Sequence, residues 1–432
     1  MQPVRLKDLS PADYERLLRR SQQDMQTIAP GVRAIIDDVR SRGDAALRDY
    51  TQRFDHAALD RLEVTPDEIA QARAQIAPEL LAALEQAART ITAFHERQLQ
   101  PEAPVETAPG VCVWRVWRPI ERVGLYIPGG KATYPSSILM SALPARIAGC
   151  REVVLCTPPR PDGSLAPIVL VAAHLAGAQR VFKLGGVQAI AALAYGTESV
   201  PQVYKIFGPG NAYVATAKML VFGQVAIDMP AGPSEVLILA DESADPRYVA
   251  ADLLAQAEHA EDSACVLVTT SRALAERVAA EVERQVATLP TCRTIRAALE
   301  RYGVLLVADS LDGAIDFVNT YAPEHLEILT ANDEEALARV HNAGSIFLGA
   351  WSPVPTGDYA SGSNHILPTG RYARFFAPLS VESFGRKVQV QRLAEHGLAG
   401  LRETIETLAL AEGLPAHRHA VNIRFAESEK AP

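Results

Sequence analysis

The chain has 432 residues, which is more than one compact core usually holds, so two or three domains are expected. Hydrophobic residues make up 48% and charged residues 22%, a composition typical of soluble globular proteins. The formal net charge of −9 argues against a basic face for nucleic acid or anionic membrane, and no apolar run reaches the roughly 18 residues that a membrane helix needs.

The five cysteines are scattered, odd in number and without CxxC spacing, which suits a reducing compartment. Cys265 lies in an apolar strand-like stretch, where a small buried side chain is the default interpretation. The first ten residues, MQPVRLKDLS, have no apolar core, so no secretory signal is expected. We therefore expect a cytoplasmic protein that binds neither nucleic acid nor membrane.

The first hundred residues have mostly helical patterns. Ser10 precedes Pro11 at a predicted helix start. Thr65 and Glu68 have the spacing of a capping box. Residues 78–94 place apolar side chains at helical spacing.

The pattern of residues then changes to short apolar stretches, predicted as strands, that alternate with Ala-rich helical stretches. Such alternation favours a mainly parallel sheet with helices on both faces, and the strands are numerous enough for two such sheets. The predicted strands are 111–117, 122–128, 152–156, 180–184, 205–207, 235–240, 265–270, 303–308 and 345–349.

The last eighty residues contain a long loop and a small unit. Residues 351–370 are rich in Pro, Gly, Ser and Asn, and loops of this length in compact enzymes are often functional. A strand is predicted at 387–393, followed by a helix and the segment AEGLPAHRHAVNIR.

Gln256 and His259 lie three residues apart in LLAQAEHAEDSACVL, 253–267, which is predicted as a helix that runs into a strand. Residues at this spacing share one helical face, and zinc binds such nitrogen and oxygen donors. A buried histidine bonded to a neighbouring group is the commoner explanation of the pair. Further ligands would come from elsewhere: Asp358 follows a Pro-Thr-Gly turn and His417 lies in the tail, and spacing alone selects neither.

PEHLEILT, residues 323–330, places Glu324 and His325 side by side after a proline suited to a first helical position or a turn. Neighbouring residues point in different directions, so the two groups can approach one substrate from two sides. Glutamate can orient or deprotonate water, and histidine takes a proton near neutral pH. The alternative is an acidic residue that stabilises a helix start beside an incidental histidine.

Three glycine-rich turns, at 126–137, 183–190 and 206–214, each follow a predicted strand and open a helix. Such backbone lets a phosphate or nucleotide approach the helix amide groups. Each turn alone is most often a tight connection, but three in one module favour nucleotide binding. None is the GxGxxG dinucleotide fingerprint.

Together these stretches resemble the histidinol dehydrogenase family, which ends histidine biosynthesis. The resemblance covers nearly the whole chain, and so many long motifs in order make it specific. The motifs are RVGLYIPGGKATYPSS, KLGGVQAIAALAYGT, FGPGNAYVATAK, DMPAGPSEVLILAD, DLLAQAEHAEDS, YAPEHLEI, GDYASGSNHILPT and AEGLPAHRHAV.

The resemblance implies an α/β fold with two Rossmann-like, aldehyde-dehydrogenase-like parallel-sheet domains that are incomplete, plus small N- and C-terminal extensions. The implied domains are a helical extension at 1–22, a catalytic and zinc-binding domain at 23–122 with 236–380, an NAD-binding domain at 123–235, and a C-terminal domain at 381–432 that contributes to the partner subunit's site.

The resemblance also assigns site residues by position. One zinc per subunit would be held by Gln256, His259, Asp358 and His417, and the catalytic pair would be Glu324 and His325. Ser234 and Glu412 match further substrate-contacting positions, beside the zinc ligands and the catalytic pair. Tyr126, Gln188 and Asn211 match positions that contact NAD. Glu412 and His417 would act across a homodimer.

The implied reaction is a four-electron oxidation of L-histidinol to L-histidine. Zinc holds the substrate imidazole and amine, which fixes the alcohol carbon near nicotinamide. His325 takes the alcohol proton, Glu324 activates water to hydrate the intermediate L-histidinal, and a second NAD oxidises the hydrate.

Some alternatives stay open at this point. His419 can replace His417 as a ligand, and His365 can belong to the site or simply bond backbone. The same scaffold can oxidise another polyfunctional alcohol, such as a sulfonated diol, or serve as a non-catalytic zinc-bound scaffold dimer.

Overall fold

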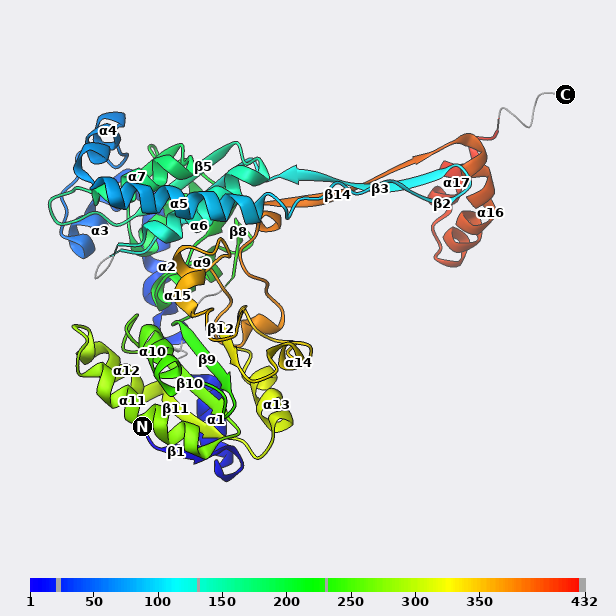
Figure 1. Cartoon of the computed structure of the whole chain (residues 1–432). Coiled ribbons are helices and arrows are strands. Elements are labelled where there is room, and N and C mark those ends of the chain that lie inside the picture. Colours follow the sequence, from blue (N-terminus) through cyan, green and yellow to red (C-terminus); the bar gives the residue numbers. More distant parts are fainter. Residues whose placement is uncertain (21–24, 130–132, 230–231, 427–432) are drawn as a thin grey trace. The chain divides into compact units, whose positions relative to one another are not determined.

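The computed structural model describes residues 1–20, 25–129, 133–229 and 232–426. The chain divides into two compact units (Figure 1). The first unit contains Met1–Gln98 and Ile120–Phe384, and the second contains Leu99–Pro119 and Gly385–Pro432. In the described part of the chain, no helix combines the length and apolarity needed to cross a bilayer.

The first unit contains a six-stranded, fully parallel sheet. Its strands are buried apolar runs, as expected for a sheet with helices on both faces. In order across the sheet they are β1 (Pro3–Arg5), β11 (Gly303–Val307), β10 (Ala264–Thr269), β9 (Glu235–Ala240), β12 (His325–Leu329) and β13 (Ser345–Leu348).

Alternate residues of β9 point to opposite faces of this sheet, as the two-residue repeat of a strand requires. Val236 and Ile238 join the core under one set of helices, and Leu237 and Leu239 join the core on the other face. The first set is α10 (Pro246–Ala257), α11 (Arg272–Val286) and α12 (Cys292–Tyr302), and the second includes α1 (Pro11–Arg19) and α13 (Leu311–Tyr321).

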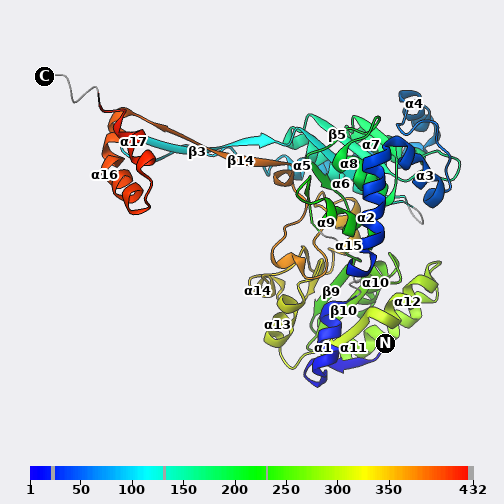
Figure 2. The ribbon, with the colours of Figure 1, turned by 180° about the vertical axis from the view of Figure 1, so that it is seen from behind.

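A second parallel sheet has five strands: β6 (Arg180–Lys183), β5 (Glu152–Thr157), β4 (Arg122–Tyr126), β7 (Lys205–Phe207) and β8 (Ala226–Ile227). Its connecting helices are α6 (Pro135–Ala148), α7 (Pro167–Ala176), α8 (Gly186–Tyr195) and α9 (Ala212–Val221). The helices α2 (Met25–Arg42), α3 (Asp44–Asp55), α4 (Pro66–Gln75) and α5 (Pro78–His95) pack outside this layer, with α2 beside α8 and α9 (Figure 2).

The second unit is built from two distant segments of the chain. β14 (Gly385–Leu393) pairs with β3 (Val111–Pro119) in antiparallel register along the whole of both strands, and β2 (Val105–Ala108) pairs with the other edge of β3. Two helices complete the unit, α16 (Glu395–Ala411) and α17 (Pro415–Asn422). Glu102 forms ion pairs with Arg115 and Lys387, which tie the two segments together.

The predicted α/β class is confirmed, and every strand predicted from the apolar runs is present. The Thr65–Glu68 capping box is also present, and the Ser10 hydroxyl accepts a hydrogen bond from the amide of Asp13. The expected domain boundaries stay a prediction.

Two local predictions were wrong, and one open alternative is excluded. PEHLEILT, for which a helix start and a turn were both open, forms β12 from His325, between β9 and β13. α10 ends at Ala257, so His259 lies beyond the helix rather than on its face. The segment 351–370 is not wholly irregular, because α15 (Val354–Tyr359) carries Asp358.

Gly208 sits where β7 ends and the third glycine-rich turn begins. Its φ of +122° is unfavourable for L side chains, and an added Cβ would overlap the carbonyl oxygen of Tyr126. Gly223 has a φ of +99°, but an added Cβ there meets no atom within 4 Å. A comparison of the same substitution at Gly208 and at Gly223 therefore separates the effect of the steric overlap from the effect of the backbone conformation alone.

We predict that Gly208→Ala lowers the free energy of unfolding by roughly 2 kcal/mol more than Gly223→Ala, because only the first must also shift the β4 backbone. Chemical denaturation of both variants measures the difference. Equal losses would show that the Gly208 turn can relax without displacing Tyr126.

Candidate active site

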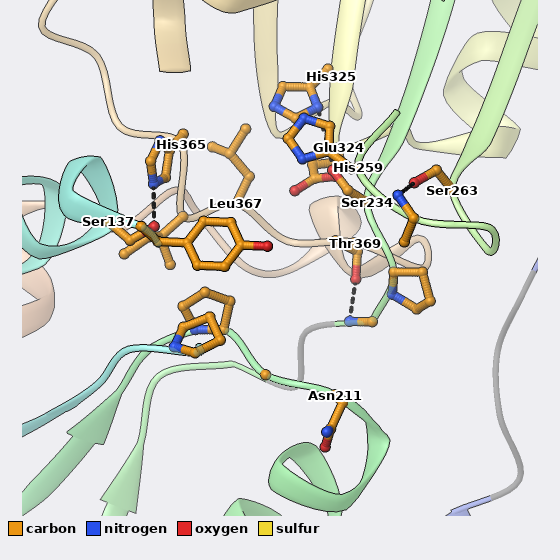
Figure 3. Close-up of a pocket in the computed structure, with 18 of the residues that line it drawn as sticks. Ser137, Asn211, Ser234, His259, Ser263, Glu324, His325, His365, Leu367 and Thr369 are labelled. Atoms are coloured by element: carbon orange, nitrogen blue, oxygen red, sulfur yellow. Dashed lines mark hydrogen bonds and ion pairs between the residues drawn. The ribbon is translucent and has the colours of Figure 1, made fainter. Parts of the chain in front are cut away.

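A cavity of about 500 Å³ contains most of the candidate residues (Figure 3). The six-stranded sheet contributes residues at the amino ends of β9, β10 and β12 to the cavity lining. The five-stranded sheet contributes residues that follow the carboxyl ends of β4 and β7. The carboxyl ends of the strands are where parallel sheets usually bind nucleotides. The predicted site residues that line the cavity are Asn211, Ser234, His259, Glu324, His325 and Asp358.

The catalytic candidates are held by one backbone residue, Glu235. Its N–H donates to Oε2 of Glu324 at 2.8 Å, and its carbonyl oxygen lies 3.0 Å from Nδ1 of His325. A carbonyl only accepts, so Nδ1 must carry the hydrogen and Nε2 is left with its lone pair. The Ser234 hydroxyl donates to the same Glu324 oxygen at 2.7 Å.

Burial sets the protonation of both candidates. It raises the pKa of Glu324 well above its ordinary value, and the neighbouring Glu235 carboxylate raises it further, while the Ser234 hydroxyl opposes this. Burial lowers the pKa of His325 to about 4, although Asp358 acts in the opposite direction. His325 is therefore a neutral imidazole at neutral pH, and its Nε2 has no hydrogen-bond partner among the described residues.

A buried ion pair that no local sequence pattern indicates involves Glu235, the residue whose N–H binds Glu324. Arg20 donates to Oε1 of Glu235 at 2.7 Å, and the Gly370 amide donates to the same oxygen at 2.5 Å. Both side chains of the pair are almost fully buried, at 3% and 2% exposed. The Arg20 guanidinium also lies 3.7 Å from the centre of the Tyr321 ring, a cation–π contact.

Gln256, His259 and Asp358 are the metal-ligand candidates of the first unit. Gln256 is 1% exposed, and neither its amide oxygen nor its amide nitrogen has a hydrogen-bond partner within the described residues. An unsatisfied buried amide is unfavourable, so a ligand for it is expected. His259 and Asp358 line the cavity. Burial raises the pKa of the Asp358 carboxyl, and the nearby His325 and His259 oppose this only in part.

The described residues contain no group of three or more His, Cys, Asp and Glu side chains arranged to hold a metal ion. The fourth candidate ligand, His417, belongs to α17 of the second unit and is exposed, as are Glu412 and His419. The cavity lining that the structure describes includes none of these three. Their participation stays a prediction.

His365, left open above, lines the cavity. Its Nδ1 lies 3.0 Å from the carbonyl oxygen of Asp358 and therefore donates, and its Nε2 lies 2.9 Å from the Ser137 hydroxyl. Burial lowers the pKa of His365 to about 4, so Nε2 accepts from Ser137. The ring bonds backbone and connects α15 to α6 at the cavity wall. Its part in the reaction stays a prediction.

The three NAD candidates lie at the glycine-rich turns. Asn211 caps α9 by accepting from the amides of Tyr213 and Val214, and it lies on the far side of the cavity from His325 (Figure 3). Tyr126 and Gln188 are buried beside the turn that opens α8 and do not belong to the described lining. Residues 130–132 of the first turn lie outside the described residues.

Comparisons with known proteins agree with these motifs. The family model described as histidinol dehydrogenase matches residues 18–425. The chain is 50% identical over 423 residues to the histidinol dehydrogenase of Methanosarcina barkeri, covering 98% of this chain and 97% of that protein. It is 50% identical over 417 residues to that of Geobacter sulfurreducens, covering 96% and 97%. A crystal structure of histidinol dehydrogenase from Elizabethkingia anophelis has 42% identity and a TM-score of 0.95, and covers 100% of this chain and 99% of that one.

We predict that Arg20→Met lowers the free energy of unfolding by roughly 3–5 kcal/mol, because it leaves the Glu235 carboxylate buried without a countercharge. The double variant Arg20→Met/Glu235→Gln is expected to recover much of this loss. Urea denaturation gives the comparison. Arg16→Met is the control on the same helix, since Arg16 is 81% exposed in its ion pair with Asp13. If Arg20→Met loses no more stability than the control, the buried pair is not structural.

Proposed function

Since the chain belongs to the histidinol dehydrogenase family of oxidoreductases, we propose that it oxidises L-histidinol to L-histidine through L-histidinal, as the last step of histidine biosynthesis, with zinc and two molecules of NAD. The proposal depends on one observation: Glu324 and His325 both line the cavity, and the backbone of Glu235 holds both of them through hydrogen bonds. Membership of an enzyme family removes the non-catalytic scaffold alternative.

The residues present fit a zinc site. The unsatisfied amide of Gln256, the imidazole of His259 and the carboxylate of Asp358 supply the nitrogen and oxygen donors that zinc accepts. We assign the fourth position to His417 of the partner subunit, as the family resemblance implies. When bound, zinc supplies a fixed point for the imidazole and amine of histidinol, which orients the alcohol carbon.

The residues also fit NAD. Asn211 lies at the start of α9 on the cavity wall, next to a glycine turn whose backbone approaches β4 closely. Tyr126 and Gln188 flank the glycine turn at α8, and the Gln188 amide oxygen has no partner among the described residues. When bound, NAD supplies the hydride acceptor.

His325 is suited to move the substrate protons. Its neutral ring presents Nε2 as a base, while the Glu235 carbonyl holds Nδ1–H and stabilises the imidazolium that forms. The bond to backbone also fixes the ring orientation. His325 therefore accepts the proton of the alcohol as it is oxidised.

Glu324 is suited to activate water for the aldehyde step. Its raised pKa makes the carboxylate a stronger base, and its Oε2 is anchored by Ser234 and the Glu235 amide. Hydration of the aldehyde gives the species that loses the second hydride. A thiol intermediate is not required, because Cys265 is buried within β10 and burial raises its pKa.

The resemblance gives Ser234 and Glu412 the role of substrate contacts, together with the zinc ligands and the catalytic pair. In this proposal Glu412 and His417 act across a homodimer in the cytoplasm, so the complete site needs two subunits.

We predict that the purified protein holds about one zinc per subunit and forms two NADH per histidinol, and that chelation removes activity. Gln256→Ala should weaken zinc retention 10-fold or more, because it removes a ligand. Metal analysis and NADH absorbance provide the measurements, with a sulfonated diol assayed in parallel. Metal-free protein with full activity would refute the zinc site, and turnover of the diol alone would refute the substrate.

We predict that Glu324→Gln slows histidinal oxidation by about 100-fold or more and histidinol oxidation much less, since only the aldehyde step needs activated water. Separate assays that start from the alcohol and from the aldehyde resolve the steps. The control is Glu261→Gln, an exposed carboxylate that is 46% accessible and pairs with Arg301. Equal, mild effects on both steps would contradict the role given to Glu324.

A further inference from the structure

Three polar side chains from separate elements meet at the Gly185–Gly186 turn that opens α8. The Gly186 amide donates to the Tyr126 hydroxyl oxygen at 3.2 Å. A Cβ added to Gly186 would lie 3.0 Å from Oε1 of Gln188, and one added to Gly185 would lie 3.3 Å from Oδ1 of Asp55. Asp55 is the last residue of α3, and neither the sequence motifs nor the reaction scheme uses it.

Two acceptor oxygens at this turn are unsatisfied. Oδ2 of Asp55 and Oε1 of Gln188 are both buried and have no hydrogen-bond partner among the described residues. Gln188 as a whole is 1% exposed. Burial raises the pKa of Asp55 to about 6, and the nearby His56 opposes this only in part. Since an ionised carboxylate only accepts, the missing partner must donate hydrogen bonds.

The charge at this turn restricts what can bind there. The amino end of a helix attracts anions, and phosphate commonly binds at such positions. At α8 the carboxylate of Asp55 already supplies a negative charge, and it repels a second one. A neutral group with neighbouring hydroxyls fits these acceptors, whereas a phosphate does not. In dinucleotide-binding folds an acidic residue commonly accepts from the ribose 2′-hydroxyl and excludes a 2′-phosphate.

We propose that Asp55 selects NAD over NADP by accepting hydrogen bonds from the adenosine ribose hydroxyls, beside Gln188 and Tyr126. The proposal rests on the assignment of NAD to the glycine-rich turns. It adds that the discriminating carboxylate comes from α3, a helix that precedes the five-stranded sheet, instead of following a glycine fingerprint within it.

Calorimetric titration of the full-length protein with NAD, NADP and ADP-ribose tests the proposal without relying on turnover. The wild type should bind NAD and ADP-ribose and bind NADP much more weakly. Asp55→Ser should weaken NAD and ADP-ribose binding about 10-fold or more, because it removes hydrogen bonds to a charged acceptor. The preference for NAD over NADP should fall by a similar factor.

Asp49→Ser is the matched control. Asp49 lies on the same helix but is 63% exposed and pairs with Arg42, so coenzyme affinities should not change. Asp55→Asn keeps the shape of the side chain and removes its charge. It should therefore improve NADP binding relative to NAD, and it serves as the test if the serine variant does not fold.

The outcomes separate the two proposals. Folded Asp55 variants with wild-type affinity and wild-type preference would overturn the role of Asp55 while leaving the NAD assignment intact. A wild-type protein that binds none of the three ligands would overturn the coenzyme assignment itself.

Discussion

The chemistry of this molecule depends on the register between β9 and β12. The two strands are parallel neighbours, and His325 lies opposite Val236. This register places the backbone of Glu235 where its N–H binds Glu324 and its carbonyl binds His325. Because successive strand residues face opposite sides, a slip of one residue would turn the imidazole away from the cavity. Sheet pairing therefore does the positioning that a catalytic loop does elsewhere.

The two sheets contribute different functions to one cavity. The six-stranded sheet presents the amino ends of its central strands, where a buried carboxylate and a neutral imidazole have shifted pKa values. The five-stranded sheet presents carboxyl ends followed by glycine turns and helix starts, which suit a coenzyme. The buried Arg20–Glu235 pair supports the edge of the six-stranded sheet, since it fixes the side chain of the residue whose backbone binds Glu324 and His325.

Local and repetitive features were predictable from the sequence, and long-range ones were not. Continuous apolar runs identified the strands, because a strand buried on both faces is apolar along its length. The start of β12 was missed because Glu324 and His325 are polar although both are buried, so the run resembles a helix start or a turn. Arg20 and Glu235 are 215 residues apart, and no local pattern connects them. Spacing indicated Gln256 and His259 as possible zinc ligands, but it selected neither Asp358 nor His417, which the resemblance alone assigns.

The second unit is built from two segments that lie far apart in the sequence, and this affects how the chain folds while it is being synthesised. β3 is made early, with the apolar sequence VCVWRVW, but its long antiparallel partner β14 lies near the end of the chain. During translation one edge of β3 has only the short β2 beside it, while the hydrogen-bonding groups of the other edge stay unpaired until β14 leaves the ribosome. Closing so large a sequence separation is slow. The nascent chain therefore exposes an edge of β3 to aggregation in the interval before β14 is synthesised, and chaperone binding during that interval would protect it.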